Sequence, residues 1–225
     1  DKAIMVCTSG STGVPKGAMI SHRNMTSMIK GLSKARPFND RDEFVSVLPL
    51  CHIAERSFSL IFPMYAGCTV NFAESVQTLQ EDLREISPTA FLTVPRIWEK
   101  MHSNIAIRIK DAFFLKRWVY RVVMPTGAKA AALSLQGRPV PLGLRLLNVL
   151  GYLALFRALR NKLGLLNGRI FVSGAAPLSA ELLHFYHGIG TPVRECFGMT
   201  ETSGICIIPG RDEIRVGRVG RPIEG

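Results

Sequence analysis

The sequence predicts an α/β fold in which layered, largely parallel sheets are flanked by helices. Short apolar runs of strand type alternate along the chain with stretches of helical periodicity, and small-residue motifs rich in glycine, serine or threonine follow several of the apolar runs. Alternation at this spacing is typical of βαβ units, which build parallel sheets. A long basic stretch without strand patterning indicates a helical insertion in that fold.

The predicted elements follow one another in the order that such units require. Strands are expected at residues 3–7, 43–48, 68–72, 90–94, 169–173 and 192–196. Helices are expected at residues 23–33, 54–64, 77–86 and 179–187. Ser179 is a predicted N-cap, and Gly67 is expected to end the second helix.

Residues 98–163 show no strand pattern and are expected to form several helices, interrupted at Pro125, Gly127, Pro139 and Pro141. Within them, residues 104–163 carry eleven lysines and arginines against one aspartate, a net charge of +10 that accounts for most of the +11 of the chain. No recognisable nucleic-acid module accompanies this charge, so nucleic acid is not an expected partner. Residues 142–163 are strongly apolar, but Arg145 and Arg157 leave only eleven uncharged residues between them, too few for a membrane span.

Composition and cysteine use indicate a globular protein of a reducing compartment. The residues are 47% hydrophobic and 20% charged, and the five cysteines form no Cys-x-x-Cys pair. We expect a cytoplasmic protein, with the basic helices in peripheral contact with the anionic inner face of a membrane. Because the chain opens at Asp1 without methionine or signal peptide, it is expected to be an internal fragment of a longer protein.

The densest group of phosphate-binding residues lies directly after the first predicted strand, at an expected strand-to-helix passage. Glycines let a backbone approach an anion, hydroxyls donate hydrogen bonds, and a lysine supplies charge. The spacing is not that of a Walker A loop, because Pro15 stands where that motif requires glycine. The predicted nucleotide-binding residues of this loop are Thr8, Ser9, Gly10, Ser11, Thr12, Gly13, Lys16 and Gly17.

Two later stretches fall at the carboxyl ends of predicted strands. The turn containing Gly174, Ala175 and Ala176 has side chains small enough for a flat ring to lie against its backbone. In the second stretch, Phe197 can stack on adenine beside Gly198, Thr200 can donate to a phosphate, and Glu201 can hold Mg²⁺. Each residue alone is more simply explained as structural or solvated, but together the two stretches complement the phosphate loop.

These three stretches resemble, in order and content, the phosphate, adenine and magnesium motifs of the acyl-adenylate-forming superfamily. The sequence most resembles long-chain fatty acyl-CoA synthetases, through Pro-Leu-x-His-x-x-Glu-Arg at residues 49–56 and Val-Pro-Arg-x-Trp-Glu-Lys at residues 94–100. The resemblance implies that His52 lies near the acyl carboxylate. Glu55 and Arg56 are expected to form an ion pair. Phe197 stands where tyrosine is usual in the family. Phenylalanine can still stack on a ring, but it cannot form the hydrogen bond of a phenol.

The resemblance implies ATP-dependent, Mg²⁺-assisted formation of an acyl-adenylate from a long-chain fatty acid, followed by transfer of the acyl group to CoA. Residues 1–225 would be part of the N-terminal adenylation domain, with residues 104–163 as an insertion, without the C-terminal domain, and inactive alone. Two alternatives stay open: a non-catalytic membrane- or lipid-binding remnant, or an enzyme that adenylates another acid or loads a carrier protein. The oligomeric state is not predicted. The expected catalytic residues are Lys16, His52, Thr200 and Glu201, the last as the metal ligand.

Overall fold

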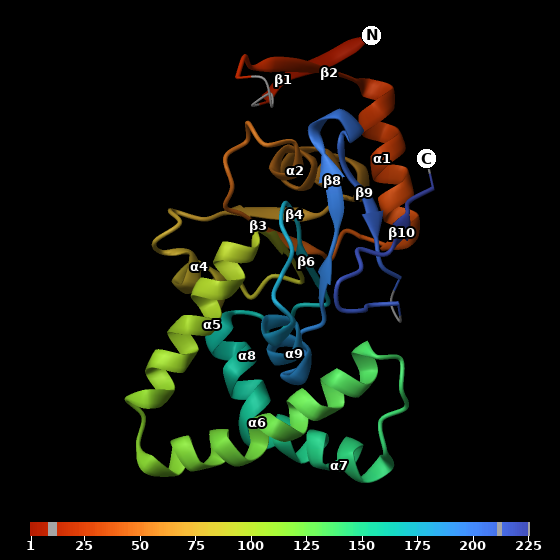
Figure 1. Cartoon of the computed structure of the whole chain (residues 1–225). Helices are drawn as coiled ribbons and strands as arrows, with labels where there is room; N and C mark the ends of the chain where they lie inside the picture. The colour runs from red at the N-terminus through yellow and green to blue at the C-terminus, as the bar shows by residue number, and fades with distance from the viewer. Residues whose placement is uncertain (9–12, 211–212, 225) are drawn as a thin grey trace.

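The computed structural model describes residues 1–8, 13–210 and 213–224, and its centre is a five-stranded parallel sheet (Figure 1). The strand order is β4-β3-β5-β6-β7, which confirms the predicted fold class. In register, Ser173 of β6 lies opposite Thr93 of β5 and Glu195 of β7. The strand bounds are Glu43–Ser46 (β3), Thr69–Phe72 (β4), Ala90–Thr93 (β5), Ile170–Ser173 (β6) and Val193–Glu195 (β7).

Each face of this sheet is covered by helices. On one face, Trp98 packs edge-on against Phe91, Phe171 and Tyr186 in a core that also includes α4 (Leu79–Ile86) and α9 (Ala180–Gly188). On the other face, α1 (His22–Ala35) packs with the continuous helix α2-η1-α3, which ends at Gly67 in a left-handed conformation. This second helix was predicted at residues 54–64 and comprises Ile53–Arg56, a π-helical turn at Ser57–Ile61, and Phe62–Ala66.

The first strand does not join the parallel sheet. Instead, β1 (Lys2–Thr8) and β2 (Lys16–Ser21) form an antiparallel hairpin, seen at the top of Figure 1. The predicted strand-to-helix passage is therefore wrong, because α1 begins only at His22, where the Ser21 hydroxyl accepts the Asn24 backbone N–H at 3.1 Å. The phosphate loop connects two strands, and its residues Ser9, Gly10, Ser11 and Thr12 lie outside the described residues.

A second antiparallel sheet contains the stretch that was expected to follow the last parallel strand as a loop. Its strands are β8 (Phe197–Met199), β9 (Gly204–Ile208) and β10 (Arg221–Pro222), with the turn η3 (Thr200–Thr202) between the first two. Gly198 permits this pairing, since a Cβ atom there would meet the Gly204 carbonyl oxygen. The sheet thereby holds Thr200 and Glu201 in a tight turn.

Helices also fill the basic segment. They are α5 (Pro95–Lys110), α6 (Phe114–Leu135), α7 (Leu142–Gly151), η2 (Tyr152–Phe156) and α8 (Arg157–Leu163). Pro139 and Pro141 fall between helices as expected, but the predicted breaks at Pro125 and Gly127 are wrong because α6 runs through both. Gly127 instead allows close packing of α6 on α9, since a Cβ atom there would lie 2.5 Å from the Gly188 oxygen.

Among the described residues, one helical stretch, Leu142–Leu163, is long and apolar enough to cross a membrane by length and composition, and 22% of its 18-residue window is buried in the protein. Its second half is attached to the domain. Leu155, Leu159 and Leu163 are buried, and the Arg160 guanidinium donates to the carbonyl oxygens of Leu165, Leu166 and Gly168. Leu142, Leu146 and Leu150 in the first half are exposed, as is Leu153 at the start of the second half.

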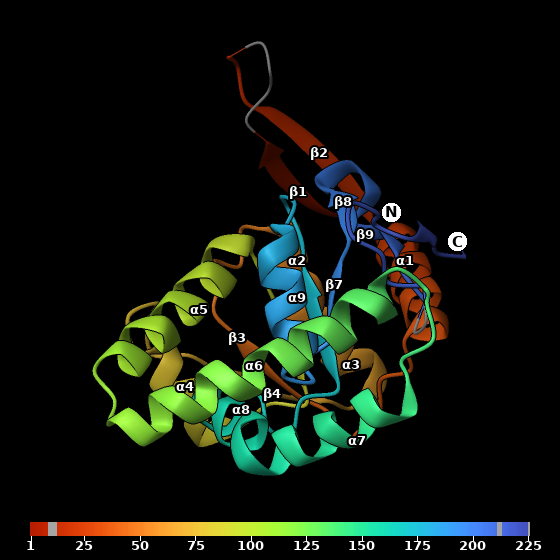
Figure 2. The same ribbon diagram turned by 60° about the horizontal axis from the view of Figure 1, so that its bottom comes forward.

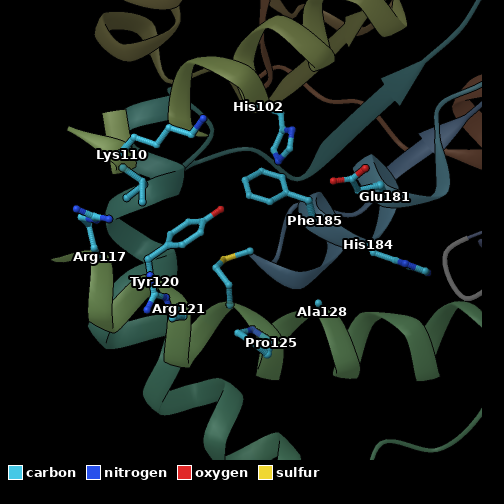
Figure 3. Close-up of a pocket in the computed structure, with 12 residues that line it drawn as sticks. His102, Lys110, Arg117, Tyr120, Arg121, Pro125, Ala128, Glu181, His184 and Phe185 are labelled. Carbon is cyan, nitrogen blue, oxygen red and sulfur yellow. The ribbon is translucent and has the colours of Figure 1, made fainter. Parts of the chain in front are cut away.

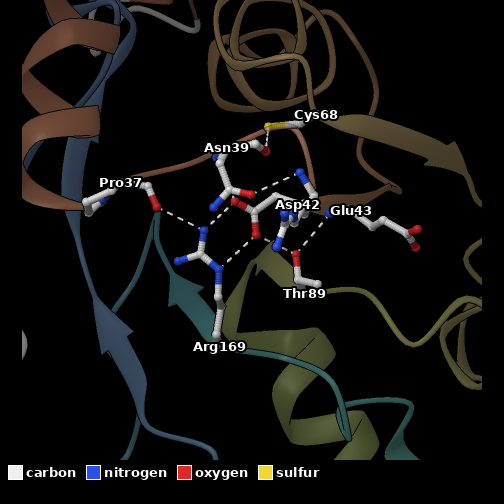
Figure 4. Close-up of polar contacts among 8 residues, drawn as sticks. Pro37, Asn39, Asp42, Glu43, Cys68, Thr89 and Arg169 are labelled. Carbon is white, nitrogen blue, oxygen red and sulfur yellow. Dashed lines mark hydrogen bonds and ion pairs between the residues drawn. The ribbon is translucent and has the colours of Figure 1, made fainter.

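Three polar residues tie together the amino ends of the parallel strands (Figure 4). Asp42, Thr89 and Arg169 each stand one residue before a strand. Thr89 donates to Asp42 at 2.7 Å, Arg169 Nε donates to it at 2.8 Å, and a second Arg169 nitrogen bonds its other oxygen. Burial alone would raise the pKa of the Asp42 carboxyl, but these bonds and the Asn39 N–H outweigh it and hold the pKa below its usual value. We call Asp42, Thr89 and Arg169 the amino-end cluster.

Candidate active site

The carboxyl ends of the parallel strands surround a cavity of about 260 Å³. It is lined by segments that follow β3, β5, β6 and β7, and by β9. Parallel strands direct all their carboxyl ends to one sheet edge, where ligands bind in α/β folds. The cavity brings together five of the predicted site residues from distant parts of the sequence: His52, Gly174, Ala175, Gly198 and Thr200.

The loop that carries His52 is fixed from two sides. Buried Glu55 accepts the Leu48 backbone N–H at 3.3 Å and the Ser59 hydroxyl at 2.5 Å, while Arg56 Nε donates to the Leu50 oxygen at 3.1 Å. Glu55 and Arg56 therefore do not form the expected ion pair with each other. Each side chain instead bonds to the backbone of the loop between β3 and α2. His52, in the same loop, is exposed and lines the cavity.

The small-residue turn after β6 is strained at Ala175, whose φ of 72° is a conformation that alanine rarely adopts. Such outliers concentrate at functional sites, where the surrounding structure enforces them. A Cβ atom on Gly174 would lie 2.9 Å from Cys196 Sγ, so glycine is needed for the turn to pass the last strand. Burial raises the pKa of the Cys196 thiol to about 12, which keeps it protonated and unreactive. Ala176 is exposed beyond the residues that line the cavity.

The turn after β8 presents polar groups next to an accessible ring. Phe197 has 48% of its surface exposed, so one face of the ring is free to stack on a planar ligand. The Thr202 hydroxyl donates to the Gly204 oxygen at 2.8 Å and accepts the Met199 N–H at 3.1 Å, which fixes the turn from inside. Within the described part of the chain, the side chains of Thr200 and Glu201 have no bonding partner and remain free for a ligand.

The hairpin supplies the remaining predicted groups. Strand β2 contacts η3, so the hairpin lies on the same side of the molecule as the turn between β8 and β9 (Figure 1). Thr8 Oγ donates to the Lys16 oxygen at 3.3 Å and so closes the base of the loop, where Lys16 and Gly17 are exposed. Gly13 has a φ of 85°, a conformation that favours glycine.

The described residues offer Mg²⁺ a limited set of ligands. No group of three or more histidines, cysteines or acids is close enough to hold a metal among residues 1–8, 13–210 and 213–224. Magnesium is commonly held by one or two carboxylates together with substrate phosphates and water. The free, exposed carboxylate of Glu201 fits that arrangement, in which most ligands come with the nucleotide.

Another cleft lies away from these residues, between α5, α6 and α9 (Figure 3). Its volume is about 850 Å³, and its lining includes Lys110, Arg117 and Tyr120 but none of the predicted site residues. Burial lowers the pKa of His102 in its wall, although Glu181 partly opposes this. Trp98 is fully buried in the core, whereas Arg96 is exposed.

Comparisons with known proteins agree with this geometry. A family model described as "AMP-binding enzyme" matches residues 1–225. A rat long-chain-fatty-acid–CoA ligase, ACSBG2, is 34% identical over 231 residues, covering 99% of this chain and 34% of the relative. The Arabidopsis thaliana peroxisomal long chain acyl-CoA synthetase 6 is 36% identical over 228 residues, covering 99% of this chain and 30% of the relative. The chain thus spans about a third of the length of these curated relatives.

Solved structures show the same fold. Apo MatB from Rhodopseudomonas palustris superposes with a TM-score of 0.66 at 22% identity, covering 100% of this chain and 34% of that structure. A malonyl-CoA ligase with bound methylmalonyl-CoA and AMP gives a TM-score of 0.64 at 24% identity, covering 100% of this chain and 38% of that structure. The chain therefore has the fold that these proteins share.

Proposed function

The chain belongs to the AMP-binding enzyme family, and from this premise we propose that the protein activates a long-chain fatty acid with ATP and transfers the acyl group to CoA. The observation that carries the proposal is the meeting of His52, Gly174, Ala175, Gly198 and Thr200 in one cavity at the carboxyl ends of the strands. The fatty-acid substrate is inferred from the long-chain ligases that are 34% and 36% identical to this chain.

In the first step, a carboxylate oxygen of the acid attacks the α-phosphorus of ATP, and the bond to the bridging oxygen breaks to release pyrophosphate. In the second, the CoA thiol loses its proton to solvent, its sulfur attacks the acyl carbonyl carbon, and AMP leaves with the electron pair of the broken carbon–oxygen bond. The acid is already ionised, so the first step requires no general base. The protein must instead hold two anions in line and stabilise the developing charge.

The residues of this chain divide that work. Lys16 and the hydroxyl of Thr200 donate to phosphate oxygens, while Phe197 stacks on the adenine above the turn at Gly174. His52, fixed by its braced loop, orients the acyl carboxylate. Mg²⁺, when held by Glu201, would neutralise part of the phosphate charge.

The assignment of Glu201 is tested by Glu201→Gln in the full-length protein, because this change removes the charge and keeps the shape. We expect ATP–pyrophosphate exchange with a long-chain acid to fall about a hundredfold or more, as for loss of a charge-stabilising group. The loss should be partly relieved at high magnesium. Glu99→Gln is the matched control, since Glu99 is exposed on α5 and does not line the cavity. Exchange near the parent rate in Glu201→Gln at ordinary magnesium would contradict the assignment.

We further propose that the basic helices hold the protein peripherally at the anionic cytoplasmic face of a membrane. Phe113, Phe114 and Trp118 at the start of α6 are exposed, as are Leu142 and Leu146 on α7. Arginines lie among them, and apolar side chains interleaved with cations are typical of interfacial helices. Because Leu155, Leu159 and Leu163 are buried in the domain, we favour a helix that lies on the surface over one that spans the bilayer.

Vesicle sedimentation tests this contact. Binding of the full-length protein should require anionic lipid, weaken as salt rises, and fall when Arg117, Arg121, Arg145 and Arg157 become Gln, because each near-surface cation contributes about 1 kcal/mol. Arg160 is left intact because its hydrogen bonds serve the fold. The control removes the same charge elsewhere, by changing Lys2, Arg23, Lys30 and Arg41 to Gln. Equal binding by the two quadruple variants would show that the helices are not the anchor.

A further inference from the structure

Helices α5 and α6 meet at an angle beside α4 and α8 (Figure 2). Side chains of these helices line an apolar groove of about 550 Å³. None of the residues that line the active-site cavity lines this groove. Its volume falls within the usual range of small-molecule sites, about 300–1,000 Å³. The proposed function does not use it, so its purpose requires a separate explanation.

The groove exists because small side chains lie between large ones. Ala154 and Ala158 are one helical turn apart on the same face of η2 and α8, and both are exposed. Around them stand longer apolar side chains from four elements, α5, α6, η2 and α8. These are Met101, Ile105, Ile109, Leu115, Val119, Leu155, Leu159 and Leu163. A chain of methylene groups would meet apolar walls along the groove.

The charged residues of the lining are all cations. Arg108, Lys116 and Lys162 are exposed, and in the part of the chain that the structure describes their charged groups have no bonding partner. The other polar lining residues, Gln80 and Asn104, are neutral, and no lining residue is acidic. Apolar walls with a cationic rim complement a molecule that has one acyl chain and one anionic head.

We propose that this groove is a second acyl-binding site, which takes a single-chain anionic amphiphile such as a fatty acid or a lysophospholipid. Its tail lies along Ala154 and Ala158, and its head is held by Lys116, Lys162 or Arg108. The outer side of the same helix corner carries the exposed side chains of Phe113, Phe114 and Trp118. An amphiphile that leaves an apolar environment at this corner reaches the groove directly.

The first test fills the groove. Ala158→Phe in the full-length protein places a ring among the apolar walls, and Ala35→Phe, at an exposed alanine on α1, is the control. Binding of submicellar myristate is measured by equilibrium dialysis without ATP. The parent and Ala35→Phe should bind one more equivalent of myristate than Ala158→Phe does, or bind that equivalent at least about tenfold more tightly. A tenfold difference is the expected effect when the phenylalanine ring forces about two methylenes of the ligand into water. Equal binding by all three proteins overturns the proposal, including the case in which another protein segment fills the groove.

The second test compares neighbouring cations that line different cavities. Lys116 faces the groove, whereas Arg117 lines the cleft between α6 and α9. Lys116→Gln should weaken the groove equivalent for myristate about threefold to tenfold and leave myristyl alcohol unaffected, because only an ionised head uses the charge. Arg117→Gln should change neither ligand. Equal weakening by both variants would assign the effect to general surface charge and contradict the site.

Competition identifies the head group. Displacement of bound myristate by lysophosphatidate at lower concentration points to a phospholipid source, and the reverse order points to free fatty acid. Equal displacement by dodecyltrimethylammonium, a cationic amphiphile, would overturn the anionic specificity. Ala158→Phe should keep ATP–pyrophosphate exchange at saturating acid. Because myristate binding is measured without ATP, the test of the groove stays valid even if the proposed catalytic function is wrong.

Discussion

The two ends of the parallel sheet use polar side chains in opposite ways. At the amino end, Asp42, Thr89 and Arg169 bond to one another, and Asp42 is only 1% exposed. At the carboxyl end, Lys16 and Glu201 are exposed and, among the described residues, have no side-chain partner. The polar groups of one end are committed to the fold, while those of the other are available to a ligand. Substitutions at the two ends should therefore separate stability from activity.

The largest effect is expected at the amino end. Asp42→Asn removes the charge that accepts these hydrogen bonds while Arg169, whose side chain is 42% exposed, stays partly solvated, so the free energy of unfolding should fall by about 2–3 kcal/mol. Chemical denaturation measures the change. Asp40→Asn, at an exposed aspartate two residues earlier, is the control and should have little effect. Equal destabilisation by both variants would show that the amino-end cluster contributes nothing specific.

The opposite behaviour is expected of Lys16. Lys16→Ala should lower ATP–pyrophosphate exchange about a hundredfold, because it removes a positive charge that stabilises the negative charge developing on the phosphates in the transition state. Its free energy of unfolding should stay within about 0.5 kcal/mol of the parent, as for other exposed positions. Lys2→Ala, on the paired strand of the same hairpin, should alter neither quantity. A Lys16→Ala protein that unfolds more easily would break the separation between the two ends.

A smaller effect is the pH dependence that the amino-end cluster imposes. The pKa of Asp42 is lower in the folded protein than its usual value of about 4, so its contribution to stability is complete above that pH. The contribution is lost as pH falls through the lowered, folded-state pKa, where the carboxylate takes up a proton. The stability difference between the parent and Asp42→Asn should therefore shrink under acid conditions. Denaturant midpoints of the parent and of Asp42→Asn, measured across pH 3 to 7, check this. A difference between the two proteins that stays constant with pH would show that Asp42 is not the titrating group.

The smallest effect tests an exception at the carboxyl end. Ser179 follows the Gly174 turn, yet its hydroxyl accepts the Leu182 N–H at 3.3 Å and caps α9, as the sequence predicted. Ser179→Ala should lower the free energy of unfolding by about 1 kcal/mol, the usual value of an N-cap. Ser134→Ala, inside α6 with an exposed side chain, is the control. An effect on activity alone would place Ser179 with the ligand-binding groups.

Local patterns were sufficient for much of the fold. Apolar runs located the five parallel strands, and Gly67 and Ser179 marked a helix end and a helix start, as the structure confirms. Pro125 shows where such patterns fail, because α6 continues through it. The prediction of a break considered only the backbone hydrogen bond that proline removes from a helix. Packing of Gly127 against Gly188 helps to stabilise α6 despite that loss.

The amino-end cluster was not predicted, although the sequence carried a faint signal for it. Asp42, Thr89 and Arg169 each stand immediately before an apolar strand, and parallel strands begin at one sheet edge. A search for polar residues at strand starts would have grouped them. The expected Glu55–Arg56 ion pair is absent because adjacent residues on a helix point in different directions. Glu55 accepts the Leu48 N–H, and Arg56 donates to the Leu50 oxygen.

By itself, the sequence determined the family resemblance and the fold class, because both are carried by short, recognisable stretches and by the alternation of strand and helix patterns. Tertiary structure decided what depends on partners far away in the chain. It made β1 and β2 a hairpin, and it placed His52 beside Gly174 and Thr200. It also left Ala154 and Ala158 exposed in a groove while it buried Leu155, Leu159 and Leu163. The physical reason is that burial and strand pairing are properties of surfaces brought together, which no local pattern contains.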